Sequence, residues 1–318
     1  MSFIRLIIIG LVVVSCNQIN NSKIAYRITE KDLIPEGITY SSTTNSYYVS
    51  SIYKTKIVKI DAKTGDFKDF IPSCLIDLRF LGLITDETHN LLWACGINSK
   101  NEKTSKVVKF NLTSGELIKA YSYPDSSANT YNDIVLDRDG NVYFTNYKGN
   151  SVYKIDKQSD SISIFFVGME IEKPNGISIS LDNKFLYIAS STKGVRVLDI
   201  ENHRIIGEPN NVYDSKGIDG LKYYENSLIG IQNGVEEKSQ IKICRYFLDE
   251  SGTIITGMEI IDQNNPLFDI PTTFVIVKKH LYCIANSQLG NINGPDCEII
   301  DSKLLQDILI LKYELREF

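Results

Sequence analysis

Four polar residues, each at the start of a short recurring motif, could do chemistry in this chain. They are Glu36, Asn132, Asn175 and Asp219, and all carry carboxylate or amide oxygens. Such oxygens, with a net negative charge, suit a hard cation such as calcium, which takes about 6–8 oxygen ligands. Soft ligands are lacking at these positions, which disfavours copper or a structural zinc.

Tight turns offer a second explanation for the same residues. Asn and Asp are frequent in turns because their side chains bond to nearby backbone. That explanation fits Glu36 poorly, since Glu is not a turn-forming residue. Both interpretations require knowing which structural elements bring the four positions together.

The motif occurs six times, and the copies start 43–53 residues apart. The copies are Glu36-Gly37-Ile38, Leu81-Gly82-Leu83, Asn132-Asp133-Ile134, Asn175-Gly176-Ile177, Asp219-Gly220-Leu221 and Thr272-Thr273-Phe274. A repeat of this period is typical of propellers, solenoids and other repeat folds. In the clearest copy, Pro174 and Gly176 indicate a loop that turns tightly into a strand.

Each motif is followed by the same series of strand signals. A second strand carries paired apolar residues such as Tyr47-Tyr48, and a third strand alternates apolar and polar residues, as in Ile57–Asp61. The sequence therefore predicts an all-β fold, a six-bladed β-propeller with four antiparallel strands per blade. In a propeller, the residue just before each innermost strand lies at one mouth of the central channel, so we expect the six motifs to converge there.

The two ends of the propeller are expected to meet in one blade. The segment Ile24–Ile28 precedes the first motif and is predicted to pair with the last strand near Ile308–Tyr313, which would remove free strand edges. The stretch Asn291–Lys303 is an irregular insertion in this blade. Only Ser302–Asp307 has any helical pattern.

The N-terminal segment reads as a targeting signal. Arg5 precedes an apolar run, Leu6–Val14, that is too short to span a bilayer. The run ends before Cys16 in a pattern that resembles the lipobox of bacterial lipoproteins, in which the cysteine carries the lipid. The alternative is an ordinary signal peptide with an incidental cysteine. We expect a signal peptide over residues 1–15, a lipidated tether over 16–23 and one propeller domain over 24–318.

The charge of the chain limits which kinds of partner are expected. The net charge is −5 and no segment concentrates Lys and Arg, so nucleic acid is not expected. Membrane contact is expected through the lipid anchor alone, at the bacterial cell envelope, and the protein is expected to be a monomer.

Cys95, Cys244 and Cys283 lie in apolar strands and are expected to be core residues. Cys74 and Cys297 lie in loops, and the sequence leaves open whether they form a disulfide.

Four segments resemble one known family. They are Pro35-Glu36-Gly37, Tyr131–Asn146, Pro174–Ala189 and Ile218-Asp219-Gly220-Leu221. They are similar to the senescence-marker-protein and gluconolactonase group of six-bladed propellers, many of which are calcium-dependent lactonases. The resemblance implies that Glu36, Asn175 and Asp219 are metal ligands and that Asn132 contacts substrate. Two positions depart from the family, because Thr130 stands where sugar-lactone members carry Arg and Leu81 places no polar group at the mouth.

Loops between second and third strands should open on the same mouth as the motifs. They add Tyr53, Asn146 and Asn286 as candidate substrate contacts, suited to a polar, hydroxylated ligand. The same residue types are common in loops without any function. The three histidines, His89, His203 and His280, are expected at the opposite mouth or the rim, so a histidine general base is not expected.

These observations lead to two functional hypotheses. In the first, the protein hydrolyses a small-molecule lactone or related ester with a divalent cation, most simply calcium. Asp219 then serves as ligand and general base and Asn132 orients the substrate. In the second, the propeller is a non-catalytic envelope protein whose mouth binds a glycan or a protein. The fold alone does not decide between them.

Overall fold

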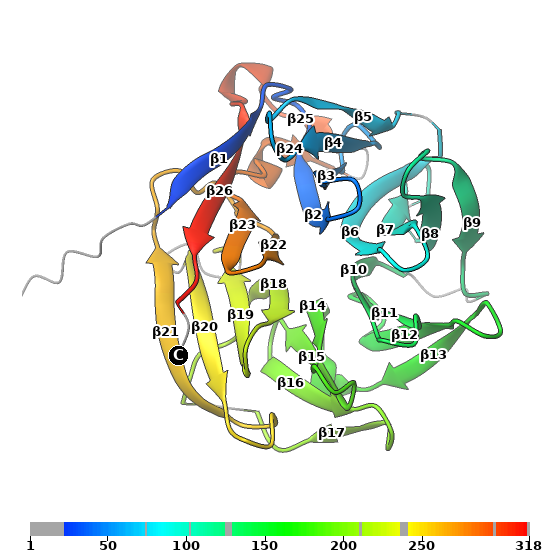
Figure 1. Ribbon diagram of the computed structural model, residues 1–318, viewed down its shortest axis with the longest axis vertical. Helices are drawn as coiled ribbons and strands as arrows, with labels where there is room; N and C mark the ends of the chain where they lie inside the picture. The colour runs from blue at the N-terminus through cyan, green and yellow to red at the C-terminus, as the bar shows by residue number, and fades with distance from the viewer. Residues whose placement is uncertain are drawn as a thin grey trace, which may run out of the picture.

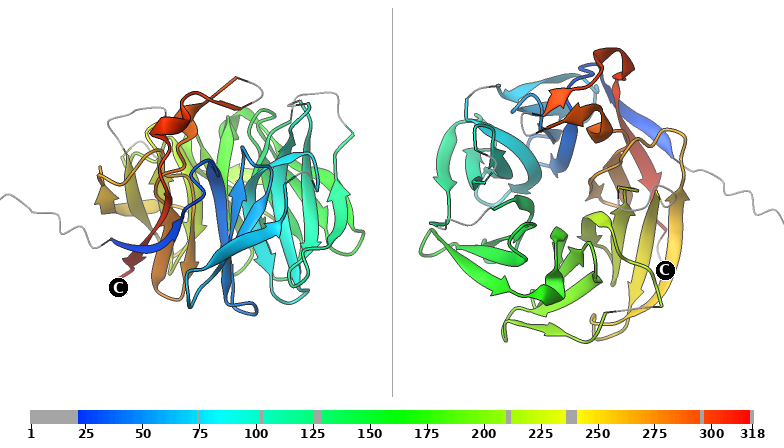
Figure 2. Two further views of the ribbon diagram at one scale, coloured as in Figure 1. Left: turned by 90° about the horizontal axis from the view of Figure 1, so that it is seen from above. Right: turned by 180° about the vertical axis from the view of Figure 1, so that it is seen from behind.

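The computed structural model describes residues 22–73, 75–101, 103–124, 129–209, 212–235, 241–294 and 297–316. Six four-stranded antiparallel sheets surround a central axis, as Figure 1 shows, and Figure 2 gives the same ring from the side and from behind. The predicted six-bladed β-propeller is therefore confirmed. The predicted signal segment 1–15, Cys16 and Cys74 lie outside the described residues, so the anchor and the disulfide stay predictions.

Five blades are continuous in sequence, with strands running in order from the axis outward. Blade 1 contains β2 (Pro35–Ser41), β3 (Ser46–Ser51), β4 (Ile57–Asp61) and β5 (Phe67–Ile71). Blade 2 contains β6 (Leu78–Asp86), β7 (Leu91–Asn98), β8 (Ser105–Asn111) and β9 (Leu117–Tyr121). Blade 3 contains β10 (Tyr131–Leu136), β11 (Val142–Asn146), β12 (Ser151–Asp156) and β13 (Ser161–Val167). Blade 4 contains β14 (Pro174–Ile179), β15 (Phe185–Ser190), β16 (Gly194–Asp199) and β17 (Arg204–Ile206). Blade 5 contains β18 (Ile218–Tyr223), β19 (Ser227–Gln232), β20 (Lys242–Leu248) and β21 (Ile255–Gln263).

Blade 6 joins the two ends of the chain. It consists of β22 (Phe274–Val277), β23 (His280–Ile284), β26 (Ile308–Glu314) and, outermost, β1 (Lys23–Ile28). In the register of β1 and β26, Ile28 stands opposite Ile308. The predicted closure by the N-terminal strand is therefore confirmed. The ring is closed by hydrogen bonds within a sheet, and among the described strands only this blade combines strands from both ends of the chain.

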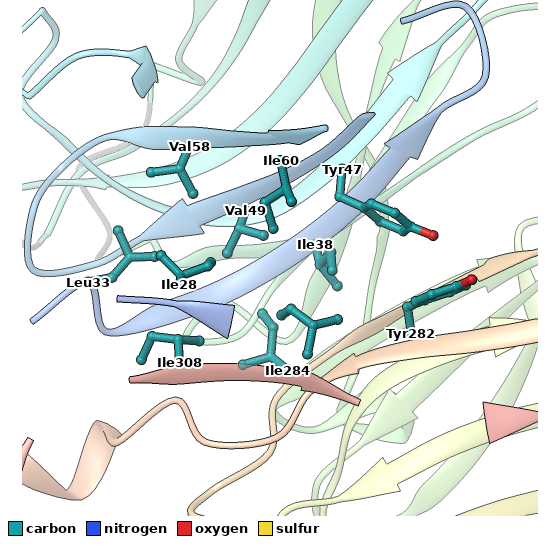
Figure 3. Packing of buried hydrophobic residues seen from close by; sticks show 11 residues of the cluster. Ile28, Leu33, Ile38, Tyr47, Val49, Val58, Ile60, Tyr282, Ile284 and Ile308 are labelled. Carbon is teal, nitrogen blue, oxygen red and sulfur yellow. The ribbon is translucent and has the colours of Figure 1, made fainter. Parts of the chain in front are cut away.

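Apolar residues between neighbouring blades form the core. Figure 3 shows the cluster between blade 6 and blade 1, where Ile28 and Ile308 face side chains of the first blade and the rings of Tyr47 and Tyr282 lie 5.0 Å apart. Alternation along each strand sends successive side chains to opposite faces, and both faces of a blade are covered by its neighbours. The core is thus a series of interblade layers.

The remaining elements are short. The 3-10 turn η1 (Met169–Ile171) precedes β14. The insertion in blade 6 contains η2 (Leu289–Asn291), a small hairpin of β24 (Ile292–Asn293) and β25 (Glu298–Ile299), and η3 (Ser302–Leu304). The helical pattern at 302–307 thus forms only one 3-10 turn. Within the described ranges, no helix has the length and apolar character needed to cross a bilayer.

The motifs differ from the sequence prediction in one respect. They were expected just before the innermost strands, but in blades 1 to 5 they lie within them, where the strand pairing shifts register. In blade 4, Pro174 pairs with Ser190 and Ile177 with Ile188, so Asn175 and Gly176 together oppose one residue of β15. Each such position is a β-bulge, which re-aims the local side chain.

The motif glycine also has a different role from the predicted tight turn. Gly176 does not have a positive φ. It lies against the neighbouring blade, where an added Cβ would collide with the backbone oxygen of Asp219. Gly82 repeats this arrangement, with an added Cβ 2.6 Å from the backbone oxygen of Asn132. The glycine is needed because adjacent bulges approach closely around the axis.

Candidate functional site at the channel mouth

The six motifs, five in bulges and Thr272-Thr273 just before β22, form a continuous ring at one end of the channel. Glycine packing brings blade 1 against blade 2, blade 2 against blade 3, blade 4 against blade 5 and blade 5 against blade 6. At the closure, the Thr272 hydroxyl of blade 6 donates to the backbone oxygen of Glu36 at 2.9 Å. Each motif residue is thus held by the next blade, so the positions of its backbone atoms depend on the whole ring.

Hydroxyl groups on two second strands strengthen this ring. Ser50 accepts a hydrogen bond from the Gly37 N–H at 2.6 Å and donates to the backbone oxygen of Leu81 at 2.7 Å. Thr145 acts in the same way between blades 3 and 4, because it accepts from the Asp133 N–H and donates to the backbone oxygen of Asn175 at 2.7 Å. A bulge frees backbone groups from the sheet ladder, and these hydroxyls satisfy them.

Two acids from blades 1 and 5 share an electrostatic environment at this mouth. Glu36 and Asp219 are each only 7% exposed. Burial raises the pKa of Glu36 well above its usual range, and the negative charges of Asp219 and Asp133 raise it further. Burial likewise raises the pKa of Asp219 to about 7. Two buried carboxylates that oppose each other's ionisation would be stabilised by a bound cation.

Amide groups complete the surroundings of Asp219. The Asn233 Nδ2 atom donates to Asp219 Oδ2 at 2.8 Å. A hydrogen bond from the Asn175 side chain also acts on Asp219 and lowers its pKa. The Oδ1 atom of Asn175 is buried and has no hydrogen-bond partner among the described residues. An unpartnered buried carbonyl oxygen is costly, and a cation ligand role would satisfy it.

The donor set at the mouth therefore fits a hard cation, with the amide as an essential member. Within the described part of the chain, no three or more His, Cys, Asp or Glu side chains are grouped so that they could hold a metal ion. The structure brings the predicted ligands Glu36, Asn175 and Asp219 into one neighbourhood. Holding a cation with these residues would require two carboxylates and the Asn175 carbonyl oxygen.

Two charged residues near this site, Asp133 and Lys222, were not predicted from the sequence. The Lys222 Nζ atom lies 3.1 Å from Asp133 Oδ2 and joins blade 5 to blade 3. The sequence did carry a signal for Asp133, since it occupies the place that Gly fills in four of the other motifs. For Lys222 the signal was a charged residue three positions beyond a motif residue, where the other blades carry uncharged ones.

The predicted substrate contact Asn132 lies in the bulge of β10 and is partly exposed. Thr130, two positions before it, is buried, and its hydroxyl has no hydrogen-bond partner in the described ranges. Leu81, the apolar member of the ring, is 5% exposed. The motif residues at the mouth are thus polar in every blade except blade 2.

The other predicted substrate contacts have different surroundings. Asn146 is buried, accepting from the Thr130 N–H and donating to Asn129 Oδ1 at 2.7 Å. Asn286 is also buried and bonds to the backbone of Asp307 and Leu309. Both amides therefore fix loops, and only Tyr53, at 36% exposure, presents its side chain to solvent.

The histidines lie away from the motif mouth. His89 and His203 lie in the turns that connect β6 to β7 and β16 to β17, and His280 is the first residue of β23. All three lie at the opposite end of the strands from the motifs. His89 Nδ1 lies 2.7 Å from Asp86 Oδ2, and the His203 ring lies against Phe165 with their centroids 4.4 Å apart. The histidines thus lie apart from Glu36, Asn175 and Asp219.

The sequence matches the family described as the SMP-30/Gluconolactonase/LRE-like region over residues 34–222, which is more than half of the chain. The chain belongs to this family. The match begins two residues before Glu36 and ends at Lys222, so it includes the first five motifs. No curated protein sequence is similar enough to be counted as a relative.

Solved structures share the propeller at low sequence identity. A gluconolactonase from Xanthomonas campestris has a TM-score of 0.63 at 12% identity, with 92% of this chain and 88% of that chain covered. The allergen Mala s 1 from Malassezia sympodialis has a TM-score of 0.68 at 15% identity, with 94% and 98% covered. A virginiamycin B lyase from Staphylococcus aureus has a TM-score of 0.60 at 17% identity, with 93% and 90% covered. At these identities the likeness concerns the fold alone.

Proposed function

We propose that this SMP-30/gluconolactonase family member is a hydrolase of a small-molecule lactone or related ester and that it depends on a divalent cation, calcium in the simplest case. One observation carries the proposal: two buried acids with raised pKa values lie beside a buried, unpartnered amide oxygen of Asn175 at one mouth. Family membership and the fold shared with a gluconolactonase support the substrate class.

The residues divide the proposed reaction among them. Glu36, Asn175 and Asp219 would hold the cation. When bound, it would polarise the substrate carbonyl and lower the pKa of a water molecule. Asp219 would also act as general base, and the hydrogen bond from Asn233 Nδ2 fixes the orientation of its carboxylate. Asn132, partly exposed beside these groups, would orient the substrate.

The positions of the histidines help to distinguish the proposed hydrolysis from a histidine-dependent reaction, which another propeller carries out. A histidine-to-alanine variant of the virginiamycin B lyase is described as catalytically inactive. In this chain the three histidines lie at the other end of the strands from the motif ring. That separation favours hydrolysis assisted by carboxylates over a histidine-dependent reaction at the mouth.

The test compares turnover and cation binding in the same protein. The chain from Asn17 onward is stripped of metal with a chelator and assayed on a panel of lactones and esters, with and without added calcium. We expect turnover only with the cation, and Asp219→Ala should abolish it. His203→Asn is a matched control, because His203 is exposed at the outer rim on the opposite side of the ring and Asn tolerates its positive φ. Calcium binding without turnover on any substrate would refute the hydrolase and favour a binding protein.

A further inference from the structure

Lys222 is the single charged residue at one repeated position of the innermost strands. This position is the third residue after the start of each motif: Thr39, Ile84, Val135, Ser178, Lys222 and Val275. Each lies further along its innermost strand than the mouth residue. The five other members are uncharged, so the ammonium group of Lys222 is a local feature of blade 5 and not a property of the repeat.

The position of this ammonium group is fixed by Asp133. Its Nζ atom lies 3.1 Å from Asp133 Oδ2, and the side chains of Lys222 and Asp133 are 24% and 9% exposed. The same carboxylate oxygen accepts from the Ile177 N–H at 3.1 Å, and Oδ1 accepts from the Ile134 N–H at 2.9 Å. The pair therefore links blades 3, 4 and 5, and the positive charge is held inside the ring instead of extending into solvent.

The pair lies within the electrostatic field of the two mouth acids. The negative charge of Asp133 raises the pKa values of both Glu36 and Asp219, and the positive charge of Lys222 lowers that of Glu36. Burial raises the pKa of the Cys95 thiol, and the charges of Asp133 and Glu36 raise it further. These groups from blades 1, 2, 3 and 5 thus form one interacting set. With all three acids ionised and Lys222 protonated, the set carries three negative charges and one positive charge. One divalent cation would neutralise it.

We infer that Lys222 sets the charge of the channel mouth and thereby determines its preference for doubly charged over triply charged cations. This inference rests on the proposed cation site. An ammonium group has only hydrogen-bond donors, so Lys222 cannot be a ligand. It acts by repelling the bound ion, and that repulsion grows in proportion to the ion's charge. Without it, the three carboxylates would favour a trivalent ion more strongly than a divalent one.

The experiment measures the affinities of the full chain for Ca²⁺ and Tb³⁺ by calorimetry and by terbium luminescence, with no substrate present. Lys222→Met should tighten Ca²⁺ binding by about tenfold and Tb³⁺ binding by more, since a unit charge near a partly buried ion shifts binding by about a factor of ten or more. The ratio of Tb³⁺ to Ca²⁺ affinity should therefore rise. Lys222→Arg keeps the charge and should leave that ratio unchanged.

Variants of Asp133 protect the test against a folding failure of Lys222→Met. Asp133→Asn, which keeps the lysine, should weaken both ions and lower the ratio. The double variant Asp133→Asn with Lys222→Met restores the wild-type net charge, and its ratio should return to the wild-type value. These results would support the inference even if the single lysine variant did not fold.

Two results would overturn the inference, and they are distinguishable. If wild-type protein binds both ions but the ratio of Tb³⁺ to Ca²⁺ affinity stays constant across the variants, the Lys222–Asp133 pair only holds the blades together. In that case the proposed cation site survives. If wild-type protein binds neither ion, the proposed function fails, and the role of Lys222 fails with it.

Discussion

Replacing Asp219 by Asn should stabilise the metal-free protein while abolishing its response to calcium. Asp219 is buried near the negative charges of Glu36 and Asp133, and one nearby positive charge, Lys222, is paired with Asp133. Without a cation, the ionised Asp219 is therefore unfavourable in the folded state. The neutral amide of Asn has nearly the same shape and carries no charge.

The magnitude follows from the pKa shift. The pKa of Asp219 rises from 3.8 to about 7 on folding, mainly because of burial. The unfolded chain thus releases this proton near pH 4 and the folded chain near pH 7, so between these values the folded state binds more protons and the free energy of unfolding falls as pH rises. The full shift corresponds to about 4 kcal/mol above pH 7. This shift already includes the stabilising hydrogen bond from Asn233 to the carboxylate, so we expect a gain of up to about 4 kcal/mol for Asp219→Asn above pH 7.

Urea denaturation in chelator and in saturating calcium provides the assay. In chelator near pH 8, the variant should unfold at a higher urea concentration than wild type, and the difference should disappear near pH 4. Calcium should stabilise wild type, by about 2.7 kcal/mol at a hundredfold excess over the dissociation constant, but not the variant. A variant that is less stable than wild type in chelator near pH 8, or one that calcium still stabilises, would refute the reasoning.

Two further predictions test the ring and the N-terminal segment. Gly176→Ala should lower the free energy of unfolding by about 1–3 kcal/mol and weaken calcium binding, because its Cβ would displace the backbone of Asp219. Gly290→Ala is the matched control, since its Cβ would have no neighbour closer than 3.5 Å; an equal loss in both would contradict the explanation by close blade packing. Cys16→Ser in the full chain should move the protein from the membrane fraction to the soluble fraction of a bacterial host, and unchanged fractionation would rule out the lipid anchor.

The blade architecture was predictable because each strand and turn is indicated by a local pattern in the sequence. Alternating apolar residues and turn signals recur with a regular period, and each blade needs only short-range antiparallel pairing. Even the closure by β1 followed, because an apolar strand such as Ile24–Ile28 before the first motif needs a partner. Those features depend on contacts within a blade or between sequence ends.

The details of the mouth depend on contacts between blades, which local patterns do not reveal. The role of Gly176 is set by a backbone oxygen of the next blade, 43 positions along the chain from Gly176 to Asp219. The Lys222–Asp133 pair spans 89 positions. Asn146 and Asn286 were predicted as substrate contacts from their loops, but the structure engages both amides in loop hydrogen bonds. Residue type showed that these loops are polar, and only the fold shows which polar groups are already satisfied.

The most direct measurement is a crystal structure of the protein soaked in terbium, with the ion located by its anomalous scattering. The proposed site predicts one strong peak at the channel mouth, within about 2.3–2.6 Å of oxygens from Glu36, Asn175 and Asp219, as expected for calcium-like coordination. A mouth without a peak at saturating terbium, or a peak that Asn175 Oδ1 does not contact, would contradict it.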